Sequence, residues 1–562
     1  MQQSSPIAGR WLARGLAVTI FFYGLLLMAL WSDSQHGGLS TVSISTATAT
    51  ATTLEQPLQL VRSDVVVGDG SISVNSSQLN SSTSSSAVSS STMLKTFLAN
   101  DGPSTLGAPQ FSCLGWRQTG GCSPDGPREP DNDADCGKNI KAGASGYCLL
   151  KNEATGEEVQ AMRVNCSSMR TEVRFNCRQA ADFARVAPQI DMLIAAKRHE
   201  EEQARRTHEQ EVQLEPKNGL LMVMYPKLLS SVYSTIRLLR SYNCSLPVEL
   251  WYLQSEMGVN PINGSKLLQS LVDEYGPTSL RGIAESEVDG FNTKVFALAN
   301  SELDQVLFLD ADNSPVKDPT YLFSTPEFVQ TGAIFWPDFW HPVNTIFNIN
   351  RESLLWELVG TPYVDMFEQE SGQLLIDRRR AGMALEMVEF MALRNPNNFE
   401  RFKLLHGDKD LFRLAWLKTN TSFHMIQTPP AAAGMVKSRH FCGMTMVQHD
   451  PQGDVIFLHH NGKKLIGEEE TSKNRVWTHI QSFVFPENLA SVSANAAERY
   501  EYMTTNYHVR IFGGGIFRNF PMCYGDNKMK SEHYKTTLWE EQPFGDLEDR
   551  LHSFAQEAST LQ

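Results

Sequence analysis

Residues 305–313 read Gln-Val-Leu-Phe-Leu-Asp-Ala-Asp-Asn, a short apolar run that ends abruptly in two carboxylates. Such a run is typical of a strand buried on both faces, and open α/β sheets bind ligands at the carboxyl ends of such strands. Because side chains alternate along extended chain, Asp310 and Asp312 project to the same side. Both can therefore offer oxygens to one hard divalent cation, Mn²⁺ or Mg²⁺. The pattern predicts a metal and diphosphate site.

The residues on either side of this run strengthen the prediction, since D-x-D alone is often a solvated turn. Residues 294–303 place apolar side chains at helical spacing just before the run, which indicates a helix, a strand and then D-x-D. A calcium-binding EF-hand loop is excluded, because Ser314 and Pro315 stand where that loop needs a ligand and a glycine.

Residues 306–323 as a whole resemble the donor-binding motif of the fungal-type Golgi α-mannosyltransferases, a family of type II membrane enzymes with a GT-A fold. The resemblance extends over roughly 217–480. It implies an α/β domain with a central, mostly parallel sheet, a Mn²⁺ or Mg²⁺ cofactor and GDP-mannose as donor. The alternative is a haloacid dehalogenase-type phosphatase, whose nucleophilic Asp, here Asp310, also lies in a D-x-D after a strand.

The start of this region has the order expected of a nucleotide-binding sheet. Residues 220–225 and 247–252 read as strands and 228–240 as the helix between them, which favours parallel pairing. By the resemblance, Tyr225 lies beside the nucleotide base and Lys294 contacts the diphosphate. The ordinary alternatives are a packed core tyrosine and a solvated helix lysine.

Two later segments resemble the acceptor side and the reaction centre of the same family. Gln373 lies in a Ser-Gly-Gln segment that we interpret as a loop entering a helix, and its amide can donate to sugar hydroxyls. Asp408 or Asp410, in His-Gly-Asp-Lys-Asp, sets a carboxylate beneath the anomeric carbon of the donor, with helix capping as the alternative. Trp336 and Trp340 are candidate acceptor-stacking residues, although most such aromatics belong to the core.

The last motif is an apolar run that ends in two histidines, at residues 454–463. The resemblance implies that His459 is the third protein ligand to the metal. It also implies that Lys463 or Lys464 lies near the phosphates.

The amino-terminal part of the chain predicts a membrane anchor. Residues 15–31 are nearly uninterrupted apolar sequence, preceded by Arg10 and Arg14 and followed by Asp33. The positive-inside rule then leaves the amino terminus cytoplasmic and the rest lumenal. A cleaved signal peptide is the alternative, but the bulky end of the run offers no clear cleavage site.

Residues 33–110 are rich in Ser and Thr and too poor in apolar residues to fold, which predicts a flexible stem. Six Asn-x-Ser/Thr triplets, all after the predicted anchor, fit a glycosylated lumenal chain. They start at Asn75, Asn80, Asn165, Asn243, Asn263 and Asn420.

Six of the nine cysteines crowd into residues 111–185, which predicts a small disulfide-stapled module of structural or acceptor-binding use. The pairing is left open, and zinc is the alternative, although no C-x-x-C spacing occurs. Nine is odd, so at least one thiol is free or pairs between chains. Residues 186–216 are charged and predict a solvated connecting helix.

The sequence therefore predicts a cytoplasmic tail and anchor (1–32), stem (33–110), cysteine-rich module (111–185), connecting helix (186–216), GT-A-like catalytic domain (217–485) and C-terminal extension (486–562). We expect a single-pass type II Golgi enzyme that transfers mannose from GDP-mannose to a mannose-containing glycan with retention, in protein glycosylation or cell-wall mannan synthesis. A UDP-sugar donor or a non-catalytic lumenal binding protein are alternatives. The net charge of −14 argues against nucleic acid as a partner.

Overall fold

The structure is a computed structural model. It describes residues 89–99, 108–207, 215–284, 288–462, 464, 475–513, 515–518, 520, 522–529 and 531–562. The predicted anchor, most of the predicted stem and the sequons at Asn75 and Asn80 lie outside these residues. Within the described ranges, no helix is both long and apolar enough to cross a membrane.

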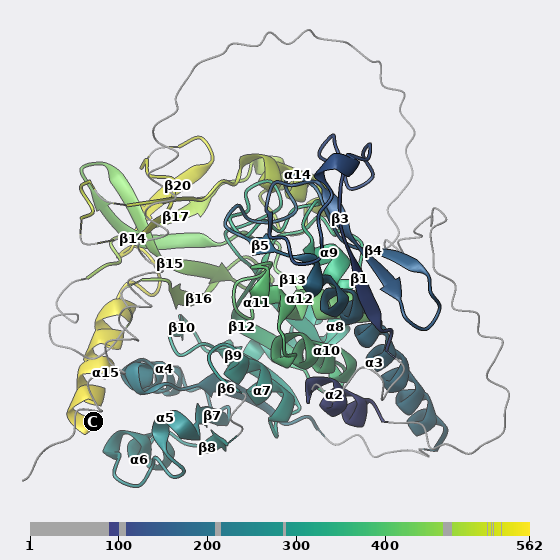
Figure 1. Cartoon of the computed structure of the whole chain (residues 1–562). Coiled ribbons are helices and arrows are strands. Elements are labelled where there is room, and N and C mark those ends of the chain that lie inside the picture. Colours follow the sequence, from purple (N-terminus) through teal and green to yellow (C-terminus); the bar gives the residue numbers. More distant parts are fainter. Residues whose placement is uncertain are drawn as a thin grey trace, which may run out of the picture. The chain divides into compact units, whose positions relative to one another are not determined.

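A seven-stranded sheet forms the centre of the fold, in the order β13-β11-β12-β9-β6-β7-β8 (Figure 1). Its strands are β6 Asn218–Val223, β7 Val248–Leu253, β8 Thr278–Ile283, β9 Gln305–Leu309, β11 Ala333–Pro337, β12 Gln369–Asp377 and β13 His424–Met425. Strand β12 runs antiparallel to both of its neighbours, and the other pairs are parallel. The predicted mostly parallel sheet is confirmed. Strand β9, which carries D-x-D at its carboxyl end, is the central strand.

The helices that surround this sheet are α4 Leu229–Ser241, α5 Gln254–Met257, α6 Lys266–Asp273, α7 Asn292–Asn300, α8 Pro326–Thr331, α9 Leu355–Val359, α10 Gly382–Leu393, α11 Asn398–Arg401 and α12 Leu411–Thr419. The longer ones, such as α4 and α6, bury an apolar face, whereas the short α5 buries no side chain. Helix α7, which leads into β9, is held at its end by Arg378, whose guanidinium donates to the carbonyl oxygens of Leu298, Ala299, Ser301 and Leu303 at 2.6–2.8 Å. A cation is favourable there because helix C-termini carry unsatisfied carbonyls.

A second sheet has eight antiparallel strands. Its strands are β10 Asn313–Pro315, β14 Ala431–Lys437, β15 His440–His449, β16 Val455–His460, β17 His479–Phe483, β18 Arg510–Phe512, β19 Cys523–Gly525 and β20 Tyr534–Leu538. All of them except β10 come after the strands of the first sheet in the sequence. Only residues 310–312 separate β9 of the first sheet from β10 of the second. D-x-D is therefore the crossing point between the two sheets.

The last 77 residues, which the sequence analysis sets apart as 486–562, are built into this second sheet. Strand β19 pairs with β15 and β20 pairs with β17, and a disulfide joins Cys442 to Cys523. Helix α14 spans Ala496–Asn506, and α15, Leu547–Leu561, runs beside α4 (Figure 1). The predicted boundary at 485 therefore divides one sheet and does not separate two structural units.

The cysteine-rich segment forms the predicted stapled module. Strands β1 Phe111–Gln118, β3 Gly146–Asn152 and β4 Glu158–Val164 make a three-stranded sheet, and β2 Ile140–Lys141 pairs with β5 Arg174–Phe175. The disulfides are Cys113–Cys136, Cys122–Cys166 and Cys148–Cys177, so these thiols bind no zinc. Cys244 is free and buried, which meets the expectation from the odd number of cysteines.

Both predicted linkers contain helix that packs into the protein: the connecting segment is helical as predicted but half-buried instead of solvated, and the stem contains a helix that the sequence analysis does not predict. Helix α3 spans Ala180–Thr207, beginning six residues before the predicted 186, and its first half buries Phe183, Ile190 and Leu193 in the core that also contains β9. Helix α2, Ser90–Leu98, lies inside the predicted stem but packs against α3 and α10. Both helices carry apolar residues at helical spacing, which explains why they pack against the core. Such short apolar patterns do not stand out in the average composition of long segments, on which the sequence prediction relied.

Candidate functional site

Asp310 and Asp312 follow β9 in a turn, which the Asn313 amide closes by donating to the Asp310 carbonyl at 3.0 Å. This turn, and not the alternation of an extended strand, brings the two carboxylates together. The side chain of Asp312 is 5% exposed and that of Asp310 is 29% exposed. His459 reaches them from β16 because β10 pairs with β16 in a register that sets Asn313 opposite His459. His459 Nε2 lies 3.4 Å from Asp312 Oδ1 and 3.9 Å from Asp310 Oδ2. The three predicted metal ligands therefore meet, with their ligand atoms within 4.8 Å of one another.

Glu370, to which the sequence analysis assigns no role, holds the other side of the His459 ring. Its Oε1 lies 3.4 Å from His459 Nδ1 and accepts a 2.7 Å hydrogen bond from the Gly372 amide. A Cβ on residue 372 would lie 2.6 Å from His459 Nδ1, so only glycine leaves room for the ring. Metal-binding histidines commonly give their second nitrogen to a carboxylate in this way. Glu370 is thus a positioning residue for His459.

The Ser-Gly-Gln segment is not the predicted loop entering a helix. It lies within β12, whose pairing with β9 sets Gln373 opposite Leu309. Gln373 is fully buried, and its Oε1 accepts from Asn313 Nδ2 at 2.6 Å. The prediction that Gln373 meets the acceptor is wrong, because its amide supports the turn after D-x-D from inside the protein.

The charges of this cluster depend strongly on one another. Burial opposes ionisation of Glu370 and Asp312, but the neighbouring His459 outweighs it, lowering the pKa of Glu370 to about 2 and the pKa of Asp312 below its usual range. Burial raises the pKa of Asp310 to about 6 despite the nearby Lys294 and His459. Burial disfavours a charged His459, yet Glu370 and Asp312 raise its pKa well above the usual value. The carboxylates thus favour a positive charge in this cluster, and a divalent cation bound to neutral His459 would supply it.

The chemistry of these donors fits the metal that the sequence predicts. Two carboxylate oxygens and one imidazole nitrogen form a ligand set that Mn²⁺ accepts, with Mg²⁺ favouring the oxygens. The carboxylate behind His459 supplies the orientation that such a ligand needs.

Lys294 is buried and not a solvated helix lysine. It projects from α7, and its Nζ lies 3.3 Å from Asp310 Oδ1 and 2.8 Å from Asp408 Oδ2. It also donates to the Ser371 carbonyl at 2.8 Å. Burial disfavours the ammonium, but the two carboxylates raise the pKa of Lys294 above its usual value. Lys294 is therefore a fixed cation that links D-x-D to Asp408.

The structure separates the two candidate reaction-centre carboxylates. Asp408 faces the pocket beside Lys294. Asp410 is fully buried, accepts from the Gln369 amide at 2.8 Å and pairs with Arg413 at 2.6 Å. Asp410 therefore has a structural role, and its prediction as a catalytic residue is wrong.

The predicted metal ligands line one pocket of about 500 Å³ together with Glu370, Lys294 and Asp408. Tyr225 lies in its wall just beyond the end of β6, where the base is expected. Lys464 also lines it, and its Nζ pairs with Asp312 Oδ2 while its side chain is 48% exposed. Lys463, the other predicted phosphate contact, lies outside the described residues.

Trp336 and Trp340, the candidate acceptor-stacking residues, are buried away from this pocket. Trp336 is fully buried and donates from Nε1 to the His449 carbonyl at 2.8 Å, and Trp340 is 4% exposed within another core cluster. Both are core residues, so their candidate acceptor role is wrong.

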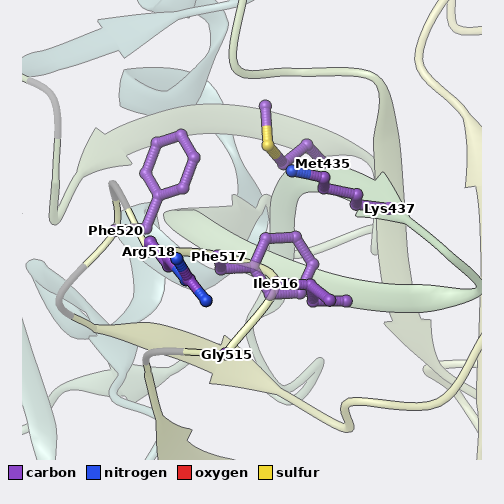
Figure 2. A pocket seen from close by; sticks show the side chains of 7 residues that line it. All are labelled: Met435, Lys437, Gly515, Ile516, Phe517, Arg518 and Phe520. Atoms are coloured by element: carbon purple, nitrogen blue, oxygen red, sulfur yellow. The ribbon is translucent and has the colours of Figure 1, made fainter.

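A second pocket, with a volume of about 490 Å³, is lined by residues of β14 and by residues 515–518 and 520 (Figure 2). Met435, Lys437, Phe517, Arg518 and Phe520 line it together with Gly515 and Ile516. It offers apolar and cationic side chains but no carboxylate, so it lacks the ligands of a metal site.

Comparison with known proteins finds similar proteins for the part of the chain that supplies most of the pocket residues. Residues 217–450 match a family model described as putative mannosyltransferase. The α-1,2-mannosyltransferase MNN2 of Saccharomyces cerevisiae is 26% identical in an alignment 274 residues long that covers 42% of this chain and 45% of that protein. The α-1,2-mannosyltransferase MNN21 of Candida albicans is 23% identical over 43% of this chain and 44% of its own. The chain spans less than half of the length of these relatives.

A solved structure of core-mannan synthase A from Aspergillus fumigatus, described as a Mn/GDP form, covers 39% of this chain and 75% of its own at 10% identity. Its TM-score is 0.27, a likeness too low to carry an argument. The fold of this chain is therefore assigned from its own strand order and register.

Proposed function

We propose, from the premise that residues 217–450 belong to the mannosyltransferase family, that this chain is a metal-dependent α-mannosyltransferase with a GT-A-like domain. It transfers mannose from GDP-mannose to a mannose-containing glycan. The activity named for its relatives supports the sugar, and the pocket supports the metal and diphosphate chemistry.

One observation carries the proposal: Asp310, Asp312 and His459, from two different sheets, meet at one pocket with their ligand atoms within 4.8 Å. Such convergence from segments about 150 residues apart in the sequence is not expected of a solvated turn. A bound Mn²⁺ would neutralise the charge that develops on the diphosphate leaving group.

The chain's own residues do the remaining work. Lys464, exposed at the pocket wall, can move from Asp312 to a phosphate oxygen when the cation takes over the carboxylate. Lys294 holds Asp408 in place, and that carboxylate faces the space where the sugar of the donor binds. There it stabilises the positive charge of an oxocarbenium-like centre, which fits transfer with retention.

The family match disfavours the phosphatase alternative, in which Asp310 would be the nucleophile. In the structure the carboxylate of Asp310 lies 3.3 Å from Lys294 and within the metal-ligand cluster, which suits a ligand. A UDP-sugar donor is the remaining alternative, because contacts to the metal and the diphosphate do not distinguish guanine from uracil.

We further propose the Golgi lumen as the location, with residues 15–31 as a type II signal anchor. Four disulfides suit an oxidising compartment. The sequon residues Asn243, Asn263 and Asn420 are exposed and open to glycosylation.

The donor is tested with the full chain, purified in detergent and given GDP-mannose, UDP-galactose or UDP-N-acetylglucosamine with Mn²⁺ and an α-mannoside acceptor. We expect GDP-mannose to be consumed fastest and an α-mannosyl product to form. Preference for a UDP-sugar would overturn the donor, and a phosphoryl group trapped on Asp310 would overturn the transferase.

The metal is tested in the same assay with Asp312→Asn, which we expect to abolish turnover and weaken Mn²⁺-dependent GDP binding. The matched control is Asp454→Asn, at a carboxylate that is 75% exposed and outside the pocket. Equal activity of the two variants would show that Asp312 is not a ligand.

A further inference from the structure

Phe291 is an exposed aromatic side chain at the pocket. Its exposed fraction is 59%, and among the residues that the structure describes it is the only Phe, Tyr or Trp that is neither buried nor half-buried. It lines the same pocket as Asp310, Lys294 and Asp408. Burying a phenyl side chain contributes roughly 1.5–3 kcal/mol of favourable free energy. A ligand that covers the exposed Phe291 ring would gain part of this free energy.

The backbone places this ring beside the reaction centre. A Cβ on Gly407 would lie 2.8–3.1 Å from three carbon atoms of the Phe291 ring, so the ring rests on the Gly407 main chain. Gly407 has a φ of +61°, a conformation that favours glycine, and the next residue is Asp408. The exposed part of Phe291 therefore borders the carboxylate that faces the donor sugar.

A second aromatic side chain, His406, extends this surface. It is exposed and lines the pocket, and its ring centroid lies 6.3 Å from that of Phe291. Behind it, Phe347 stacks on the imidazole with centroids 5.1 Å apart and an interplanar angle of 15°. The other support of Phe347 is Lys409, whose Nζ lies 4.2 Å from the ring centroid.

Lys409 itself cannot swing away, because it is buried and ion-paired. Its Nζ contacts Glu368 and lies 2.9 Å from Asp338, and both carboxylates are also buried. The support behind His406 is therefore rigid, and a ligand that stacks on the surface loses little further conformational entropy of the protein.

We propose that Phe291 and His406 form the acceptor subsite, with Phe291 stacking on the C–H face of the pyranose that receives the transferred sugar. This rests on the proposed function and deepens it. A pyranose ring offers an apolar C–H face to the phenyl ring, and its hydroxyls find the imidazole of His406 beside it. The nucleotide base, the other flat ligand of this reaction, is assigned to the Tyr225 side of the pocket at the end of β6.

The test compares Phe291→Ala, Phe291→Tyr and the wild-type full chain, with Val329→Ala as control at an apolar side chain that is 64% exposed and outside the pocket. We expect Phe291→Ala to raise the KM for an α-mannoside acceptor about tenfold, the size of one aromatic contact. The KM for GDP-mannose and its hydrolysis without acceptor should stay unchanged, and Phe291→Tyr should restore acceptor binding.

A change in the KM for GDP-mannose instead would assign Phe291 to the base and overturn the inference, as would an unchanged acceptor KM. Binding of α-linked mannobiose, measured by saturation-transfer NMR with GDP and Mn²⁺ present, separates this from failure of the proposed function. If the wild type transfers no mannose but binds mannobiose and Phe291→Ala does not, the subsite stands and the proposed activity fails. If mannobiose binds both proteins equally, or neither, the subsite is wrong whatever the turnover.

Discussion

Replacement of Glu370 by Gln isolates the one carboxylate that orients His459 without being a predicted metal ligand. Its Oε1 lies 3.4 Å from His459 Nδ1 and accepts from the Gly372 amide at 2.7 Å. The Gln side chain has the same shape and keeps an oxygen for Gly372, so β12 should be undisturbed. The Gln side chain lacks the negative charge of Glu370. That charge orients the His459 imidazole and makes the imidazole a stronger ligand for the metal.

Loss of such a partner typically weakens metal binding by 10- to 100-fold, or about 1.4–2.7 kcal/mol. We expect the fall to lie in this range for Mn²⁺, because a single charge is removed and the two aspartates remain. The assay is a Mn²⁺ titration of the full chain with GDP present, followed by the electron paramagnetic resonance of free Mn²⁺. Glu400→Gln, at an exposed carboxylate of α11, is the matched control.

An unchanged Mn²⁺ affinity in Glu370→Gln would refute the reasoning, and it would mean that the metal does not bind through His459. The midpoint of thermal unfolding must match that of the wild type. A large drop would show instead that the carboxylate stabilises the fold through Gly372.

Three further predictions concern the support of the site. Arg378→Met leaves the carbonyl oxygens at the end of α7 unpaired and should cost about 3 kcal/mol of stability, measured by denaturant unfolding. Burial raises the pKa of Glu548 to about 7 although two backbone amides donate to it. A raised pKa favours the folded state while the carboxyl is protonated, so the contribution of Glu548 to stability is fully present below pH 4.5 and is lost as the pH rises through 7. This loss is at most about 3 kcal/mol and should be absent in Glu548→Gln. Asp408→Asn should abolish turnover with little change in the unfolding midpoint, whereas Asp410→Asn should destabilise the protein by about 3 kcal/mol. The reverse result would exchange their roles.

Local patterns account for the parts of the fold that the sequence predicts. The run at 306–309 is apolar throughout because β9 is the central strand of its sheet and these four residues are buried. Asp310 and Asp312 come together as the sequence predicts, but through the turn after β9 and not through alternation along a strand. His459 needed the family resemblance, because only the β10–β16 register brings it to the aspartates.

The residues that sequence reasoning missed or misplaced depend on contacts between distant segments. Nothing near Glu370 in the sequence indicates His459, 89 residues later, and Gly372 reads as a turn although it makes room for that ring. Asp408 and Asp410 are equivalent by spacing, but Asp410 adopts a φ of +67°, which breaks the alternation and turns its carboxylate inward to Arg413. A left-handed residue that is not glycine or asparagine gives little signal in sequence.

The metal site is shared between two sheets, and this explains why the chain past 485 cannot be an optional extension. Asp310 depends on β9, whereas His459 depends on β16, which is held in place by β15. Strand β15 is paired in turn with β19 and joined to it by the Cys442–Cys523 disulfide. Farther along the chain, Glu548 at the start of α15 accepts from the Trp477 amide, and the Trp477 ring lies 4.9 Å from that of His460, next to the ligand. Residues nearly 90 positions beyond His459 therefore help to set the geometry of the proposed metal ligands, so the proposed catalytic domain extends from 217 to 562.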